Sequence, residues 1–347
     1  MKKVFLSILA VAALASCVED LGYDNPISFG APFVGNTTKA AEDPSYGDPT
    51  KDAVALTKFN VYGTVQGTGA GVVNIFDGVE VNGTVGGEWG YETKYNQYWI
   101  PGAKYNFAAV VDAETVELGT VNKLPATLTP AKNGAYYKDM LYDKAAEIES
   151  ATADQGKVNF AFEHLLAKAQ FVVTSNTEGG YYYNVKNIKI QNIHTGAVYT
   201  VGTTGADGKD SGTWAGTLSP SANDWFSLGN ILNITKANAE GGTSGKFMTN
   251  ETQVLLIPTT DEFQVEFVVE LWNDNGAADD VLLREIHYTT TAPTNGAEHE
   301  APIKVNTDLV KGYAYNFNLN LTAGSLIQFT VTSNPTWASG DVNLGLE

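Results

Sequence analysis

The chain has 347 residues, of which 39 are acidic and 21 basic, so its net charge is −18. This charge argues against binding to nucleic acid or to anionic membrane surfaces, because both would repel the protein. The length allows two domains that each have a core of their own. Charged residues make up only 17% of the chain, and 35 glycines accompany 17 tyrosines, a composition typical of strands joined by tight turns.

The first residues have the features of a secretory signal peptide. Lys2 and Lys3 precede the apolar run VFLSILAVAAL, which is too short to span a bilayer. The sequence Leu-Ala-Ser directly before Cys17 resembles the lipobox of bacterial lipoproteins, and Cys17 is the only cysteine, so it cannot form an internal disulfide. We expect residues 1–16 to be a lipoprotein signal peptide and Cys17 to carry a lipid anchor. The alternative is an ordinary signal peptide with an incidental cysteine.

Alternating apolar and polar residues predict strands along most of the chain. In chain order the clearest are FNVYGTV at residues 59–65, FQVEFVVELW at 263–272, VLLREIHYTT at 281–290 and LIQFTVTS at 326–333. The second and third are separated by NDNGAADD and are expected to form a hairpin. Helices are expected only near residues 139–150 and 226–237. The sequence therefore predicts an all-β fold.

A six-residue pattern occurs twice. GAKYNF, with Gly102, Tyr105 and Phe107, recurs 210 residues later with identical spacing as GYAYNF, starting at Gly312. Coincidence of two common turns is one explanation, and two domains of similar plan are the other, which fits the length better. Because two strand-like runs meet around His164, we expect the domains at residues 40–163 and 164–347.

No catalytic site is visible, and we expect a protein that is not an enzyme and that uses no cofactor or metal. The four histidines are far apart and lack the spacing of metal ligands. The acidic stretch WNDNGAADD lacks the order of an EF-hand loop and is better interpreted as a hairpin turn. The sequence contains no nucleotide-binding glycine pattern and no nucleophile elbow.

The stretch GEWGYETKYNQYWIP indicates an alternative function. Its aromatic residues include Trp89, Tyr95 and Tyr98, which could stack on sugar rings if exposed, although Trp and Tyr more often fill cores. A surface-anchored glycan-binding lipoprotein is therefore a second hypothesis.

Several motifs together resemble the fimbrillins of Bacteroidales, the pilin subunits of type V pili. The resemblance covers nearly the whole chain and rests on the lipobox at Cys17 and on PISFGAPF, NTTKA, YWIPGAKYNFAAV, DMLYDKA, FEHLLAKAQFVV, VKNIKIQNIHTG, VLLIPTT and LVKGYAYNFNLNLTAGSLIQFTVTSNPTW. It implies two tandem transthyretin-like β-sandwich domains after a lipoprotein signal peptide. It also implies export to the cell outer membrane, proteolytic removal of an N-terminal segment, and polymerisation by strand exchange into a cell-surface fimbrium. The implied partners are other copies of the chain, other pilus subunits and the lipid anchor of the precursor.

The resemblance further implies roles for particular residues. In the precursor, a strand of the propeptide (residues 17–39) fills the subunit's own groove, and after cleavage a neighbour's C-terminal strand replaces it. The expected self-strand residues are Ile27, Phe29 and Phe33, the expected donor residues are Val342, Leu344 and Leu346, and the expected cleavage lies between Lys39 and Ala40. The family usually cuts after Arg, whereas this chain has no Arg before Arg284.

Three positions in such a pilus are compatible with the sequence. A subunit that stays uncleaved keeps its lipid and serves as an anchor, and a tip subunit has no neighbour to which it donates a strand. The apolar alternation of the last residues favours a stalk subunit, which supports adhesion and biofilm formation through the fibre.

Overall fold

The fold is described from a computed structural model of the chain. The described residues are 26–34, 56–84, 87–133, 136–150, 156–175, 180–205, 209–218, 225–235, 246–247, 254–273, 280–321, 327–334 and 343–344. Within them the regular structure is almost entirely strand, with one 3₁₀ turn at Thr93–Tyr95. The all-β prediction is therefore confirmed. None of the described residues forms a helix of the length and apolarity needed to cross a membrane.

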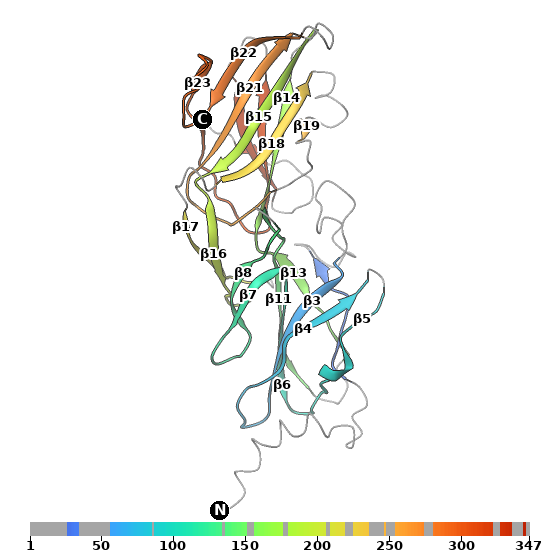
Figure 1. Cartoon of the computed structure of the whole chain (residues 1–347). Helices are drawn as coiled ribbons and strands as arrows, with labels where there is room; N and C mark the ends of the chain where they lie inside the picture. The colour runs from blue at the N-terminus through green and yellow to red at the C-terminus, as the bar shows by residue number, and fades with distance from the viewer. Residues whose placement is uncertain are drawn as a thin grey trace, which may run out of the picture. The chain divides into compact units, whose positions relative to one another are not determined.

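The chain divides into two compact units (Figure 1). The first unit comprises residues 1–131, 138–165 and 198–215, and the second comprises residues 132–137, 166–197 and 216–347. The main boundary between the units lies between Leu165 and Leu166. Residues 132–137 lie before this boundary but belong to the second unit, and residues 198–215 lie after it but belong to the first.

The first unit is built on a seven-stranded sheet. Its order is β2 (Phe33–Val34), β13 (Ala161–His164), β11 (Leu141–Glu149), β6 (Lys104–Val111), β3 (Lys58–Gln66), β4 (Val73–Gly83) and β5 (Trp89–Gly90). The central strands β3 and β6 pair antiparallel and bury Phe59, Val61 and Phe107, as the alternation of FNVYGTV predicts. These side chains belong to the hydrophobic core of the first unit.

Two smaller sheets complete this part of the chain. The short strands β1 (Ser28–Phe29) and β12 (Lys157–Val158) pair with each other. A four-stranded sheet has the order β17 (Thr213–Leu218), β16 (His194–Thr200), β8 (Pro125–Pro130) and β7 (Ala113–Leu118). Tyr199 and Thr200 of β16 pair with β8, in agreement with the grouping of residues 198–215 with the first unit.

The second unit is a sandwich of two sheets. One has the order β19 (Lys246–Phe247), β14 (Ala167–Ser175), β25 (Ala314–Leu321), β26 (Gln328–Asn334) and β27 (Asn343–Leu344), with β20 (Val254–Leu256) also on β14. The other has the order β18 (Trp225–Ile234), β15 (Tyr181–Gln191), β21 (Phe263–Asn273), β22 (Val281–Tyr288) and β23 (Glu298–Glu300), with β24 (Ile303–Val305) on β21. Rings from the two sheets meet in the core: Phe171 lies 5.8 Å from Phe267, and Phe263 lies 5.8 Å from Phe317. A pair of two-residue strands, β9 (Lys132–Asn133) and β10 (Tyr136–Tyr137), also belongs to this unit.

The predicted hairpin is confirmed, and both predicted helices are wrong. β21 and β22 pair antiparallel side by side, as Figure 1 shows. The regions expected to be helical form β11 and β18 instead. Leu141 at the start of β11 pairs with Val111 on one side and His164 on the other, and this two-sided pairing outweighs the helix propensity of DKAAEIE. A bulge between Ala145 and Ile148 interrupts the alternation, which is why the sequence pattern resembles a helix.

Gly102 and Gly312 occupy turns of the same kind, each directly before a buried aromatic strand. Their φ angles are 78° and 72°, in the left-handed region that favours glycine. Tyr105 and Phe107 follow in β6, and Tyr315 and Phe317 follow in β25, all four of them buried. The repeated pattern therefore corresponds to a repeated local structure.

Candidate assembly site

Residues 26–34 lie inside the first unit, where they complete its core. The side chains of Ile27 and Phe29 are fully buried, and Val34 is nearly so. The backbone is held at both ends of β1: the Ile27 N–H donates to the Gln97 carbonyl (2.7 Å), and the Gly30 N–H donates to the Val158 carbonyl (2.9 Å). The side chains of this segment are thus part of the hydrophobic core of the first unit.

The ring of Phe29 sits in a pocket made of five other aromatic rings, which we call the Phe29 pocket. Its centroid lies 5.5–6.5 Å from rings contributed by strands β3, β4 and β6 and by the segments that follow β5 and β12, namely Phe59, Phe76, Tyr91, Phe107 and Phe160. Most of these pairs are edge-to-face, a geometry that aromatic rings favour. The Phe29 ring is fully buried among them.

Gly63 of β3 allows two walls of this pocket to close. A Cβ at this position would lie 2.8 Å from the Phe76 ring and 2.9 Å from the Phe107 ring, closer than real carbon atoms approach. From the sequence, Gly63 was expected in a strand but not in a site. Phe76, Tyr91 and Phe160 were not expected in a site either, because their only signal is an aromatic residue in or beside an alternating stretch.

Tyr91 adds a polar contact at the edge of the Phe29 pocket. Its hydroxyl donates to the Ile27 carbonyl at 2.5 Å. Burial raises the pKa of Tyr91 to about 12, so the hydroxyl keeps its proton and acts as a donor at neutral pH. The carbonyl of a strand seated here therefore has a fixed partner.

The ladder that holds residues 26–34 is short. β1 pairs with β12 through two residue pairs, and β2 pairs with β13 through two, both in parallel orientation. By contrast, β14 and β25 share eight parallel pairs in the second unit. The ladder is therefore short, and the buried side chains of Ile27, Phe29 and Val34 add to the few backbone hydrogen bonds that hold the segment.

In the second unit, the position that corresponds to Pro26 is occupied by Thr259, which lies in the interior of that unit's own sequence. In the first unit, Pro26 forms a bridge to Tyr98, four residues before Gly102; in the second, Thr259 forms a bridge to Leu309, three residues before Gly312. Thr259 follows β20 within the sequence of the second unit, whereas Pro26 is joined to the rest of the first unit through residues 35–55. A cut in residues 35–55 would therefore separate only the segment of the first unit.

The C-terminal strand lies on the edge of a sheet in the second unit. β27 pairs antiparallel with β26, with Leu344 opposite Val331 and Asn343 opposite Thr332. Phe33 lies in β2 opposite Ala161. The other residues of the expected site, Cys17, Lys39, Ala40, Val342 and Leu346, fall outside the described residues, so their roles stay predictions.

Comparison with known proteins identifies the family. The profile of the family described as fimbrillin-like matches residues 48–335. The chain belongs to the fimbrillin-like family. The resemblance seen in the sequence is thereby confirmed.

One solved structure resembles this fimbrillin in fold, and a second aligns with a lower score. A fimbrial protein from Bacteroides vulgatus superposes with a TM-score of 0.58 and 16% identity, over 81% of this chain and 93% of that chain. A candidate cell adhesion protein from Bacteroides uniformis gives a TM-score of 0.48 and 13% identity, over 91% of this chain and 99% of that chain. No curated protein sequence matches the chain.

The aromatic stretch that pointed to sugar binding is mostly part of the core of this fimbrillin. Trp89 is only 7% exposed and stacks on Phe59 at 5.4 Å, and Trp99 is buried against Tyr105 at 4.7 Å. The interpretation of Trp89 as an exposed platform is therefore wrong, because the pairing of β5 with β4 turns its indole inward. Tyr95 is 40% exposed and is the one large exposed ring of the stretch among the described residues.

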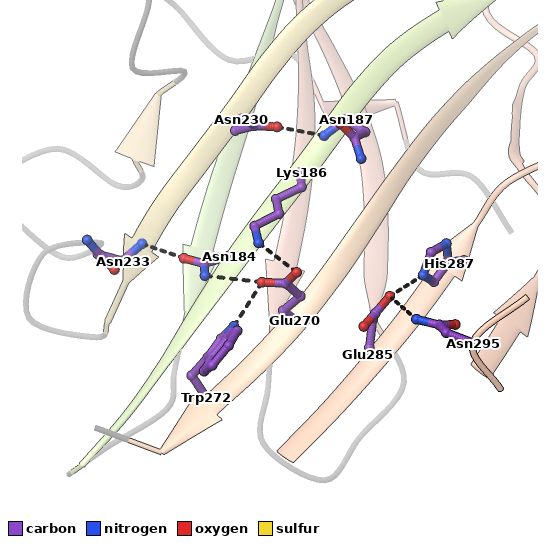
Figure 2. Close-up of polar contacts among 10 residues, drawn as sticks. All are labelled: Asn184, Lys186, Asn187, Asn230, Asn233, Glu270, Trp272, Glu285, His287 and Asn295. Atoms are coloured by element: carbon purple, nitrogen blue, oxygen red, sulfur yellow. Dashed lines mark hydrogen bonds and ion pairs between the residues drawn. The ribbon is translucent and has the colours of Figure 1, made fainter. Parts of the chain in front are cut away.

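A polar network covers part of the sheet formed by β18, β15, β21 and β22 (Figure 2). At its centre, the Glu270 carboxylate accepts hydrogen bonds from Lys186 (2.7 Å), Trp272 (2.8 Å) and Asn184 (3.2 Å). Burial by itself raises the pKa of Glu270, but the three hydrogen bonds outweigh it and hold the pKa below its ordinary value. Asn184 also accepts from the Asn233 N–H. The network thus joins three neighbouring strands of this fimbrillin.

The histidines take part in structural contacts. The ring of His164 contacts Asp139 at 2.9 Å in the interior of the first unit, and His194 lies 3.4 Å from Asp261. His287 contacts Glu285, which also accepts from Asn295 (Figure 2), and His299 contacts the Thr289 carbonyl at 2.7 Å. Within the described ranges, no three His, Cys, Asp or Glu side chains are arranged to hold a metal ion.

Proposed function

We propose that this fimbrillin is a stalk subunit of a type V pilus, which polymerises by strand exchange after proteolysis. The observation that carries the proposal is the position of residues 26–34. Phe29 completes the core of the first unit, yet β1 and β2 each share a ladder of only two residue pairs with the neighbouring strand. A segment with so short a ladder can be exchanged for another strand that offers similar side chains.

The proposed division of the chain follows from this exchange. Residues 1–16 are the signal peptide, residues 17–39 the propeptide with the self-strand, and residues 40–163 and 164–347 the two sandwich domains. Lipidation at Cys17 anchors the precursor to the outer membrane, since each buried methylene of an acyl chain contributes about 0.8 kcal/mol. Cleavage between Lys39 and Ala40 then releases the self-strand, and Val342, Leu344 and Leu346 of a neighbour take its place. The fibre contains copies of this chain and other pilus subunits, and it serves adhesion at the cell surface.

A stalk role is favoured over the alternatives by two features. Residues 342–346 offer apolar side chains at alternate positions, which a stalk subunit donates to its neighbour and a tip subunit does not. The burial of Trp89 and Trp99 removes much of the basis for a glycan-binding lipoprotein. A head-to-tail contact of this kind generates an open filament rather than a closed dimer.

Polymerisation triggered by a protease tests the proposal. The full chain is treated with trypsin and analysed on a gel without boiling, where wild type should form ladders. Deletion of residues 342–347 and the double substitution of Lys39 and Lys51 by Ala, which removes both lysines between residues 35 and 55, should each abolish them. Lys51→Ala alone, which keeps the expected site at Lys39, is the matched control that should behave as wild type. Ladders from uncut protein, or from the deletion variant, contradict strand exchange.

Lipidation is tested separately. Cys17→Ala expressed in a Bacteroidales host should incorporate no labelled fatty acid, whereas wild type should be labelled. Equal labelling of both proteins contradicts the assignment of Cys17.

A further inference from the structure

Four residues near the end of the chain repeat the chemistry of the strand that fills the Phe29 pocket. Ile27-Ser28-Phe29-Gly30 and Val342-Asn343-Leu344-Gly345 share a β-branched residue, a small polar residue, a large apolar residue and a glycine, in that order. The structure shows what each position of the first set requires. A strand that replaces this one has to satisfy the same requirements.

The first three positions require alternation. Ile27 and Phe29 are fully buried, while Ser28 between them is partly exposed. Val342 and Leu344 are apolar and Asn343 is polar, so the alternation agrees at all three positions. This part of the match by itself is common among strands.

The fourth position favours a small residue. Gly30 is buried, and a Cβ added there would lie 1.9 Å from Oδ1 of the Asn159 side chain. Asn159 is exposed and its side chain can turn away, but a larger residue also has to fit the buried position while its N–H donates to the Val158 carbonyl at 2.9 Å. Gly345 meets this requirement, and it follows Leu344 as Gly30 follows Phe29.

We propose that the C-terminal strand of a second copy of this chain enters the first unit in the direction and register of residues 27–30. Val342 takes the place of Ile27, Leu344 enters the Phe29 pocket, and Gly345 lies against Asn159. This inference rests on the proposed function, because the pocket has to be vacated by the self-strand first. It adds the register of the donor strand and the residues that determine its specificity.

This register gives Leu344 and Leu346 different roles, although alternation alone would place both on the buried face. Leu346 falls at the position of Ala31, which is exposed, so Leu346 contributes little to binding. Leu344 carries most of the side-chain contact, but it is smaller than Phe29 and leaves part of the five-ring pocket unfilled. A partly filled apolar pocket binds less tightly than a filled one, so the pocket of this subunit prefers an aromatic residue at position 344.

The experiment compares ladder formation by trypsin-processed full-length variants on unboiled gels at increasing temperature. Leu344→Ala should abolish the ladders, whereas Leu346→Ala should match wild type. Leu344→Phe should give ladders that persist to a higher temperature and should compete into mixed fibres about tenfold better than wild type. Gly345→Val should reduce the ladders, and Asn343→Ser, on the exposed side, should not. Thermal unfolding of each uncut variant shows whether the substitution has damaged the free subunit, since Leu344 also pairs with Val331 in β26.

The outcomes distinguish the register from the exchange itself. Equal losses from Leu344→Ala and Leu346→Ala, or weaker ladders from Leu344→Phe, overturn the register and leave strand exchange standing. Absence of ladders from processed wild type overturns the proposed function and the register with it.

Discussion

Tyr105 and Tyr315, 210 residues apart, make the same pair of hydrogen bonds in the two units. Each hydroxyl accepts from the backbone N–H five residues earlier, from Ile100 at 2.7 Å and Val310 at 2.8 Å. Each donates to the carbonyl seven residues earlier, that of Tyr98 at 3.1 Å and Asp308 at 2.7 Å. The tyrosine thus closes the turn around Gly102 or Gly312 onto the strand that follows it, and the shared geometry shows that the repeated pattern is a structural element of both units.

Removing either hydroxyl should destabilise the unit that contains it by a similar amount. Tyr105→Phe and Tyr315→Phe each leave a carbonyl and an N–H without their partner, at a cost of about 1–3 kcal/mol in the free energy of unfolding. Urea denaturation of the full chain, followed by tryptophan fluorescence, measures the loss. Tyr181→Phe is the control, because Tyr181 is 42% exposed. A loss in only one of the two variants contradicts the equivalence of the turns.

Truncation of Phe29 should have one of the largest effects in the first unit. Phe29→Ala empties a pocket between five rings, and comparable buried substitutions cost about 3–5 kcal/mol. The unfolding midpoint of the precursor should fall accordingly, while Ser28→Ala, at the partly exposed neighbouring position, should change it little. A small effect of Phe29→Ala would show that the core can collapse around the vacancy and that the segment is not what stabilises the unit.

Asp143 should make the protein more stable at mildly acidic pH than at neutral pH. Burial raises the pKa of Asp143 to about 6, an effect that the Glu163 charge reinforces and that the Ala161 and Lys144 N–H groups partly offset. Because the pKa is higher in the folded than in the unfolded chain, the folded state binds the proton more readily. Stability therefore rises as the pH falls from 7 towards 4, by at most about 3 kcal/mol from this group.

Chemical denaturation between pH 4.5 and 7 measures this dependence. Asp143→Asn keeps an oxygen for the Ala161 N–H, which donates to Asp143 at 2.6 Å, and should be more stable than wild type at pH 7 with a flatter pH profile. Glu114→Gln, on the exposed part of β7, is the control for removing one negative charge. If Asp143→Asn keeps the slope of wild type, the pH dependence comes from other groups.

Glu270 should act in the opposite direction on the second unit. Its lowered pKa means that the carboxylate stabilises the folded state at neutral pH, and that this contribution is lost as the pH falls through the folded-state pKa. Glu270→Ala leaves Lys186 and the Trp272 indole without their acceptor and should cost about 2–4 kcal/mol. Glu270→Gln, which keeps an oxygen for Trp272, should cost less. Equal stability of the alanine variant and wild type would mean that water replaces the carboxylate fully.

The sequence predicted strands best where one face is buried and the alternation is unbroken. FNVYGTV and FQVEFVVELW both became strands, with Phe59, Val61 and Val65 of the first and Phe263, Val265, Phe267 and Val269 of the second buried. It failed at residues 141–149, where a bulge breaks the alternation and pairing partners on both sides, distant in the sequence, decide the structure. The environment of Trp89 was left open for the same reason, since its burial depends on the pairing of β5 with β4.

The Phe29 pocket could not be predicted from sequence patterns, for a different reason. The importance of Phe29 was expected, but its five neighbours come from five separate stretches between residues 59 and 160. Each of these rings fits an ordinary core position when its own stretch is considered alone. Only the folded unit brings them around one side chain.

The single arginine of the chain affects which proteases can act on the folded protein. Arg284 lies in β22 opposite Leu271 of β21, and its guanidinium donates to both carboxylate oxygens of Glu298, at 2.8 and 2.7 Å. A protease has to draw the bond that it cuts into its own cleft as an extended segment, and the bond after Arg284 is not free to move in this way while the sheet is intact. An enzyme that cuts only after arginine therefore leaves the folded subunit whole.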